Sequence, residues 1–121
     1  MARENMIYTI AVDINAGVNT RASAKLTISR DDSFSFNEIR FSATDNFYVK
    51  FKDSSSQKLW SDDFIHSSVL SSINWNGSTK AGLIILPMQK RITGNTDIII
   101  ELLNDSGNAN KVFFAFNGIK E

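Results

Sequence analysis

The chain lacks several of the residues on which common protein sites are built. Its 121 residues include no cysteine, one proline and one histidine. The absence of cysteine excludes disulfides, thiolate metal sites and cysteine nucleophiles, and it leaves the redox compartment open. Because His66 has no histidine partner, a two-histidine metal site or a relay between histidines cannot be built. We therefore expect neither a metal nor a cofactor.

The chain also lacks net charge and long apolar runs. Thirteen basic residues balance thirteen acidic ones, so the chain as a whole has no net field that would attract nucleic acid or an anionic membrane. No stretch approaches the ~18 consecutive apolar residues of a membrane-spanning helix. The N-terminal sequence MARENMIYTIAVDINAG has no signal-peptide pattern. We expect a protein with no nucleic-acid partner and no membrane partner.

What the sequence does contain is a two-residue apolar period. In MIYTIAVDI, SAKLTIS, SFSFNEIRFSA and NFYVKFKD, apolar side chains occupy alternate positions, as they do in half-buried strands. The phase of this alternation changes near Asn37 and Glu38, which indicates a bulge. The four segments predict an antiparallel meander, in which SRDDS forms a hairpin turn between the second and third strands.

The second half of the chain ends in its strongest strand signals. Residues 54–81 are irregular, and any short helix is expected between Asp62 and Ser72. GLIILP predicts a strand that is buried on both faces or leaves the sheet at Pro87, before a polar connection. DIIIELL and KVFFAFNG, separated by NDSGNAN, predict a terminal hairpin whose last strand lies centrally. The side chains of that strand expected to be buried are Val112, Phe113, Phe114 and Phe116.

These signals together predict the fold class. About eight strands with frequent turn signals and no long amphipathic helix indicate an all-β fold, an antiparallel β-sandwich resembling a jelly roll. The length fits a single domain over residues 1–121. Residues 1–5 form either a flexible N-terminal arm or a contact that orders on assembly.

Few residues are candidates for chemistry. His66 is formally able to join a serine and an aspartate in a triad, but no G-x-S-x-G turn is present, so we interpret it as a loop or surface histidine. The doublets Asp31-Asp32 and Asp62-Asp63 could meet around calcium, although turn formation and capping is the favoured interpretation. We expect a protein that is not an enzyme.

Two groups of residues are candidates for recognition. Trp60 and Trp75 lie in serine-rich segments, where an indole stacks on a sugar, inserts into a partner or anchors a loose loop. Lys50, Lys52 and Lys58 alternate with aromatic residues, as on a platform for single-stranded nucleic acid. With no net charge, the same lysines are better explained as protection of an edge strand.

The C-terminal third resembles a pattern found in small β-sandwich structural proteins of tailed bacteriophages. It contains an apolar strand ending near proline, a polar link, a strand of the type I-x-I-E-L-x-N, a Ser/Gly/Asn turn, and a last strand ending in glycine and a basic residue. The matching positions are Pro87, Ile98, Ile100, Glu101, Leu102, Asn104, Ser106, Gly107, Asn110, Val112, Gly118 and Lys120. The upstream sequence from Asn37 to Asp62 is compatible with the strands and interrupted loop of such proteins.

The resemblance implies a capsid decoration protein or a head or tail accessory protein that binds the particle lattice in multiple copies. Its partners would be other virion proteins and further copies of itself, in a virion assembled in the host cytoplasm. The alternative is a carbohydrate-binding β-sandwich that uses exposed tryptophans. The residues expected to make the contacts are Ala2, Arg3, Glu4, Asn5, Trp60, Asp62, Phe64, Trp75 and Asn76.

Overall fold

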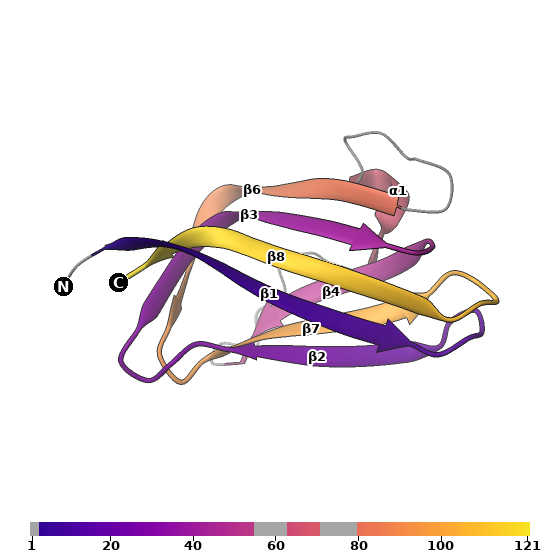
Figure 1. The fold of residues 1–121 in the computed structure, drawn as a ribbon, viewed down its shortest axis with the longest axis horizontal. Helices are drawn as coiled ribbons and strands as arrows, with labels where there is room; N and C mark the ends of the chain where they lie inside the picture. Colours follow the sequence, from indigo (N-terminus) through magenta and orange to yellow (C-terminus); the bar gives the residue numbers. More distant parts are fainter. Residues whose placement is uncertain (1–2, 55–62, 71–79) are drawn as a thin grey trace.

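The computed structural model describes residues 3–54, 63–70 and 80–121, and these form two antiparallel four-stranded sheets packed face to face (Figure 1). In sheet A the strand order is β1 (Glu4–Ile14), β8 (Asn110–Lys120), β3 (Ser33–Ala43) and β6 (Lys80–Thr93). In sheet B it is β2 (Arg21–Thr27), β7 (Asp97–Asn104), β4 (Phe47–Asp53) and β5 (Ile65–His66). The predicted all-β sandwich is confirmed.

The order 1-8-3-6 facing 2-7-4-5 is that of an eight-stranded jelly roll. The meander predicted for the first four strands is wrong, because β1 and β3 belong to sheet A whereas β2 and β4 belong to sheet B. The segment SRDDS does turn, since the Asp32 backbone N–H donates to the Ser29 carbonyl (3.0 Å). It nevertheless carries the chain from one sheet to the other and does not close a hairpin.

The predicted terminal hairpin is also wrong, because its two strands belong to different sheets. Strands β7 and β8 are consecutive, but β7 pairs with β2 and β4, whereas β8 pairs with β1 and β3. The expectation that the last strand lies centrally is confirmed, because β8 runs between β1 and β3 in sheet A (Figure 1).

The connection from β7 to β8 is held across the end of the sandwich by side chains. The Asn110 amide oxygen accepts from the Thr44 hydroxyl (2.9 Å) and the Asp45 backbone N–H (3.1 Å). Its amide nitrogen donates to the backbone carbonyls of Asp45 (3.0 Å) and Asn46 (3.1 Å). Ser106 donates to the Asp45 carboxylate (2.7 Å). Ser106 and Asn110, which belong to the segment predicted to form a hairpin turn, therefore attach this connection to the loop between β3 and β4.

Strand β6 also differs from its prediction. It continues through Pro87 to Thr93, and it lies at the edge of sheet A. Pairing with β3 shifts register between Phe36 and Glu38, whose partners on β6 are Lys90 and Ile85. This confirms the bulge predicted near Asn37, and it accommodates a proline that cannot donate to a sheet ladder.

Aromatic side chains fill the space between the sheets. Phe34, Phe36, Phe114 and Phe116 of sheet A and Phe47 of sheet B are at most 1% exposed. Their rings meet edge to face across the layers, as in the pair Phe47 and Phe114 with centroids 6.2 Å apart. The alternation read from the sequence thus correctly identified the inward faces of β1 to β4.

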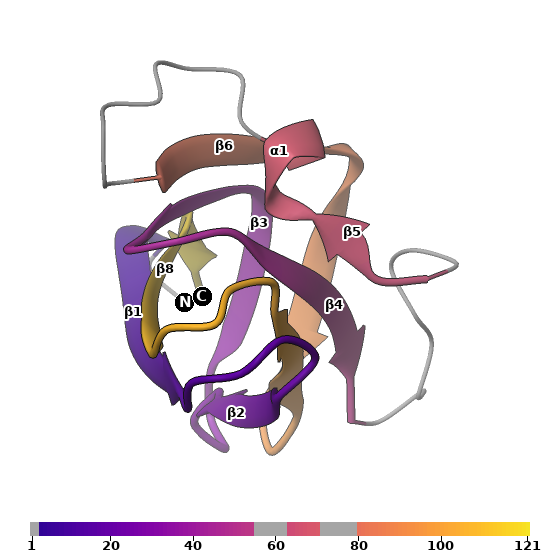
Figure 2. The same cartoon turned by 90° about the vertical axis from the view of Figure 1, so that its right-hand side faces the viewer.

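The described residues contain one short helix of about a single turn. It is α1 (Ser67–Leu70), within the predicted window, and it follows β5 at one end of the sandwich (Figure 2). Among the described helices none is long and apolar enough to cross a membrane.

Gly118 lies where β8 approaches β3 most closely. A Cβ atom at this position would overlap the backbone oxygen of Ser35 and crowd the side chain of Phe36. We expect Gly118→Ala to lower the free energy of unfolding by about 1–3 kcal/mol, as overpacking typically does. Gly107→Ala is the control, because its Cβ would meet open space. Urea denaturation of both variants measures the difference, and equal stabilities would contradict the close approach.

Candidate interaction surface

The outer face of sheet A carries small and apolar side chains where polar ones usually face solvent. The strand register places its outward residues in three rows. These are Ile7, Asn117, Glu38 and Ile85, then Thr9, Ala115, Arg40 and Leu83, then Ala11, Phe113, Ser42 and Ala81. We call this set the apolar face.

Three large apolar side chains of this face are open to solvent. Ile7 is 59% exposed, Ile85 is 67% exposed and Phe113 is 48% exposed. Between β1, β8 and β3 the surface is hollowed by about 490 Å³, with lining residues Thr9, Ile10, Ala11, Arg40, Phe41, Ser42, Phe113, Phe114 and Ala115. Small side chains in the middle of the face make this hollow. Exposed apolar side chains grouped on one face of a domain are typical of an interaction site.

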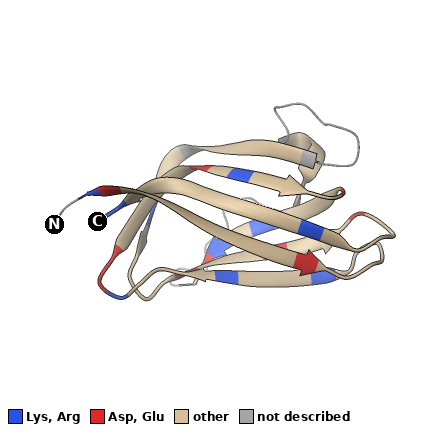
Figure 3. Ribbon diagram, viewed as in Figure 1, with Lys and Arg blue, Asp and Glu red and all other residues tan. Residues whose placement is uncertain are grey.

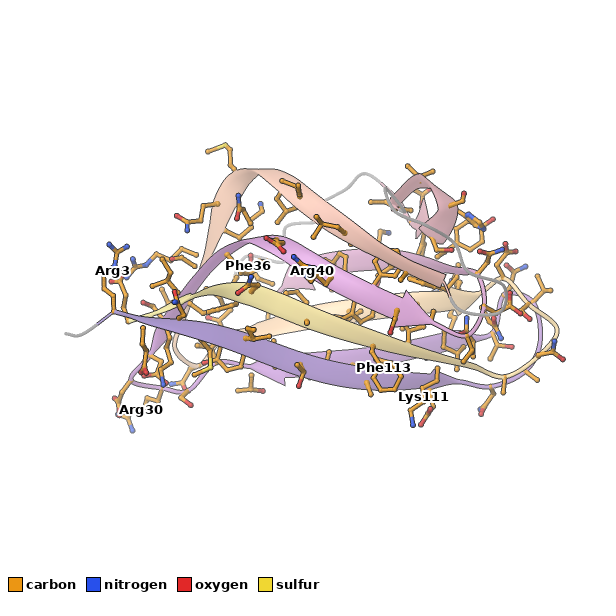
Figure 4. All side chains as sticks on the ribbon, turned by 45° about the horizontal axis from the view of Figure 1, so that its top comes forward. Arg3, Arg30, Phe36, Arg40, Lys111 and Phe113 are labelled. Carbon is orange, nitrogen blue, oxygen red and sulfur yellow. The ribbon has the colours of Figure 1, made fainter. Side chains whose placement is uncertain are left out.

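The few charges on and beside the apolar face are balanced. Arg40 donates to the Glu38 carboxylate (2.8 Å) within the face, and Lys111 lies 3.9 Å from Asp13 at its end. Figure 4 shows Arg40 and Phe113 on the neighbouring strands β3 and β8. Because each cation has a carboxylate beside it, the face can approach an uncharged partner surface without leaving a single uncompensated charge.

The outer face of sheet B has a different character. Its outward residues on β2, β7 and β4 include the basic side chains of Arg21, Lys25, Lys50 and Lys52 and the acidic ones of Asp97 and Glu101. Figure 3 shows the two basic positions along β2. Lys52 lies 3.7 Å from Glu101. The charged residues lie among Tyr48, Ile99 and Leu103, which point outward on the same face and are half-buried.

Phe64 is the described member of the predicted contact residues from the irregular middle segment. It is half-buried, and the Lys50 ammonium lies 4.9 Å from its ring centroid. Together with Arg21, Ser23 and Glu101 it borders a hollow of about 400 Å³ on the sheet B side. Phe64 therefore packs on the charged face and lies apart from the predicted N-terminal contacts.

The predicted N-terminal contacts lie beside the C-terminus, at the end of the sandwich that is opposite to α1 (Figure 1). Glu4 and Asn5 are part of β1, where Glu4 pairs with Lys120. Arg3 forms an ion pair with Glu121 (3.0 Å). A hydrogen bond from Lys120 to the Glu4 carboxylate raises the pKa of Lys120, and the charges of Glu4 and Asp32 act in the same direction. The two ends of the chain thus stabilise each other locally.

The remaining predicted contact residues are Ala2, Trp60, Asp62, Trp75 and Asn76, and they lie outside the described residues, as does Lys58. Lys50 and Lys52 are on β4, which pairs with β5 through Tyr48 and Val49. Past Val49 the described pairing of β4 is with β7 alone. Lys50 and Lys52 therefore lie where β4 has one described partner strand, which agrees with the interpretation that they protect an edge strand.

The structure does bring a serine, the histidine and an aspartate together. The Ser68 hydroxyl lies 2.7 Å from His66 Nδ1, and Asp105 Oδ2 lies 2.7 Å from His66 Nε2. The Ser68 backbone N–H also donates to Nδ1 (3.2 Å). Nδ1 is therefore the acceptor, and a neutral ring carries its proton on Nε2, where it is donated to Asp105.

This arrangement is that of a helix cap. His66 immediately precedes α1, and its ring accepts an N–H that the first turn of a helix leaves unsatisfied. The Nδ1 lone pair is shared with that backbone N–H, and the hollows described above are lined by other residues. The geometry supports a structural function for His66, joining α1 to the loop between β7 and β8.

The acidic doublets do not gather as a metal site among the described residues. The Asp32 carboxylate lies 4.0 Å from the Lys120 ammonium, and Asp63 accepts the backbone N–H of Phe64 (2.7 Å). The part of the chain that the structure describes contains no group of three or more histidine, cysteine, aspartate or glutamate residues that could hold a metal ion.

The apolar face was missed by sequence reasoning, although one signal for it was present. The run VFFAF is apolar at every position, so its strand must present apolar side chains on both faces of the sheet. Burial was predicted for Phe113 together with its neighbours, and that is wrong, because Phe113 points outward while Phe114 is 1% exposed.

Comparisons with known proteins give distant likenesses. No protein-family model matches the chain, and no curated protein matches it. Among solved structures, the virus-like particle of extra small virus from the giant freshwater prawn Macrobrachium rosenbergii is 14% identical, with 96% of this chain and 79% of that chain covered and a TM-score of 0.43.

Two further solved structures are more distant still. A Cry1Da tryptic core variant of Bacillus thuringiensis is 11% identical (88% and 17% of the two chains covered, TM-score 0.37). Desmodium yellow mottle tymovirus is 7% identical (99% and 87% covered, TM-score 0.32). Sequence identities and TM-scores as low as these support no inference about the function of this chain.

Proposed function

We propose that this protein is a non-enzymatic structural component of a virus particle, bound to neighbouring virion proteins through the apolar face of sheet A. The observation that carries the proposal is that face, which gathers Ile7, Ile85 and Phe113, three of the six large apolar side chains that are exposed among the described residues. Each exposed apolar side chain favours association, because contact removes it from water at about 25 cal/mol per Å².

The fold supports this assignment over binding of a small ligand between the sheets. Jelly rolls occur in capsid proteins, lectins and cupins. In this chain the space between the sheets is filled by phenylalanine side chains such as Phe34, Phe36 and Phe116. Recognition must therefore take place on the outside of the sandwich, where the shape and repeated contacts of an assembly protein are found.

The finer proposal follows the C-terminal resemblance. The protein is a capsid decoration component or a head or tail accessory component of a tailed bacteriophage, present in multiple copies and assembled in the host cytoplasm. Neither a cofactor nor a metal is required for this function, since the contacts are made by side chains of the chain itself.

Mass spectrometry of purified particles tests the proposal. We expect the wild-type protein in the particles. Phe113→Lys should fold normally, because the side chain is half exposed, but it should be depleted from particles, because a charge replaces the exposed aromatic ring of the apolar face. Val18→Lys is the matched control, since Val18 is a 62% exposed apolar residue of the loop between β1 and β2, and it should be incorporated normally.

Two outcomes would contradict the proposal. Particles that lack the wild-type protein would exclude a virion component. Quenching of tryptophan fluorescence by a glycan, lost on Trp60→Ala or Trp75→Ala while particle composition is unchanged, would establish the carbohydrate-binding alternative.

A further inference from the structure

Sheet A ends in two edge strands that differ in their ability to pair with another strand. Strand β6 contains Pro87, shifts register against β3, and carries basic residues such as Arg91, all of which discourage further pairing. Strand β1 pairs with β8 in unbroken register from Glu4 to Ile14. Its residues 5–12 contain no proline and no charge, and the middle of β1 is uncharged in Figure 3.

The core is also incompletely covered along the side where β1 lies. Nearly all of the apolar side chains that pack on the core while staying partly exposed belong to β1 and β2, namely Met6, Tyr8, Ile10, Ala22, Ala24 and Leu26. These two edge strands lie on the same side of the sandwich (Figure 2). A long unprotected edge and exposed core residues thus occur together, and the apolar face continues from the same edge through Ile7.

We propose that β1 pairs antiparallel with β1 of a second copy of this chain, so that the two copies of sheet A form one continuous eight-stranded sheet. This inference goes beyond the proposed function, because it concerns the edge of sheet A, which borders the apolar face at Ile7. A strand edge is complementary to itself by its backbone groups, and antiparallel pairing of identical strands requires a two-fold axis. A second copy therefore satisfies the edge with the same contacts in both directions.

The side chains select a register centred on Thr9. With Thr9 opposite its symmetry mate, Ile7 is placed opposite Ala11 on the outer face. On the inner face Tyr8 is placed opposite Ile10, and Met6 lies opposite Val12. Large side chains then meet smaller ones in the outer pairs, and the partly exposed inner side chains are covered by their counterparts.

Charge complementarity supports the same register. Asn5 is placed opposite Asp13, so Arg3 of one copy lies diagonal to Asp13 of the other, at a separation that long side chains span. Arg3 pairs with Glu121 (3.0 Å) and Asp13 lies 3.9 Å from Lys111 within one copy, but their side chains are 69% and 80% exposed and can also face the neighbouring copy. The two-fold axis creates this contact twice.

A charge-swap experiment on the full chain tests the pairing. Thr9 is exposed, so we expect substitutions at this position to leave the fold intact. In sedimentation velocity we expect wild type to be a dimer, and both Thr9→Lys and Thr9→Glu to be monomers, because each places two like charges opposite each other. An equimolar mixture of the two variants should recover the dimer. A monomeric wild type, or a Thr9→Lys variant that stays dimeric, would overturn the inference.

Oxidative cross-linking fixes the register, since the chain has no cysteine of its own. Thr9→Cys should form a covalent dimer, because its symmetry mate lies directly opposite, whereas Ser23→Cys on the outer face of β2 should not. Equal cross-linking of the two variants would overturn the proposed register. Dimerisation through β1 by a protein that is absent from particles would refute the proposed function alone, and a monomer found in particles would refute this inference alone.

Discussion

A chain that ends at Asn110 is expected not to fold cooperatively. Strand β8 separates β1 from β3 in sheet A, so deleting residues 111–121 leaves β1 without its partner and opens the middle of the sheet. The deletion also removes Val112, Phe114 and Phe116, each at most 1% exposed. At about 1.5–3 kcal/mol for each fully buried side chain, together with the lost strand pairing, the cost is comparable with the 5–15 kcal/mol that stabilises a typical domain.

Circular dichroism during thermal unfolding, with size-exclusion chromatography, measures this result. A chain lacking residues 1–3 is the control. Arg3 is the one described residue that it removes, and the exposed ion pair of Arg3 with Glu121 is of a kind that contributes little. The control should keep its sigmoidal transition. A shortened chain without β8 that is soluble, monomeric and cooperative would show that the last strand is an appendage.

Replacing Phe114 by alanine is expected to lower the free energy of unfolding by about 3–5 kcal/mol. The ring is 1% exposed, and it lies edge to face against Phe47 and Phe51 of sheet B, with centroids 6.2 Å and 5.7 Å away. Phe114 therefore joins the two layers of the sandwich. Its removal leaves a cavity that rigid neighbouring strands cannot close, in addition to the lost apolar burial.

Phe113→Ala is the matched control, since it makes the same chemical change one residue earlier on the same strand. Phe113 is 48% exposed on the apolar face, so its truncation should change stability by roughly 0.5 kcal/mol. Guanidinium denaturation of both variants gives the two free energies. Losses of equal size would mean that β8 is not oriented as described.

The candidate surface was only partly accessible to sequence reasoning. Arg3, Glu4 and Asn5 were predicted as contacts and lie beside the β1 edge that we propose as an interface, whereas Phe64 lies against the charged face of sheet B. The exposed residues Ile7 and Phe113 were not predicted as contacts. Their alternation was visible, but an apolar residue on the outer face of a strand has the same sequence pattern as one that a further layer would bury.

Local sequence by itself determined the strands and their inward faces. A strand needs only its own two-residue alternation, so Phe34, Phe36, Ile39 and Phe41, with the bulge between the two pairs, were identified without any knowledge of their neighbours. The short helical turn at Ser67–Leu70 was likewise expected within its segment.

Only the tertiary structure decided which strands are partners. Turn residues such as those of NDSGNAN reverse the chain equally well between two strands of one sheet or between two sheets, so local chemistry does not distinguish a hairpin from a crossover. The choice depends on contacts between residues far apart in sequence, such as Asn110 with Asp45 and Phe114 with Phe47. The same long-range pairing turned Phe113 outward, placed Ile7 and Ile85 on one face with it, and left β1 as an open edge.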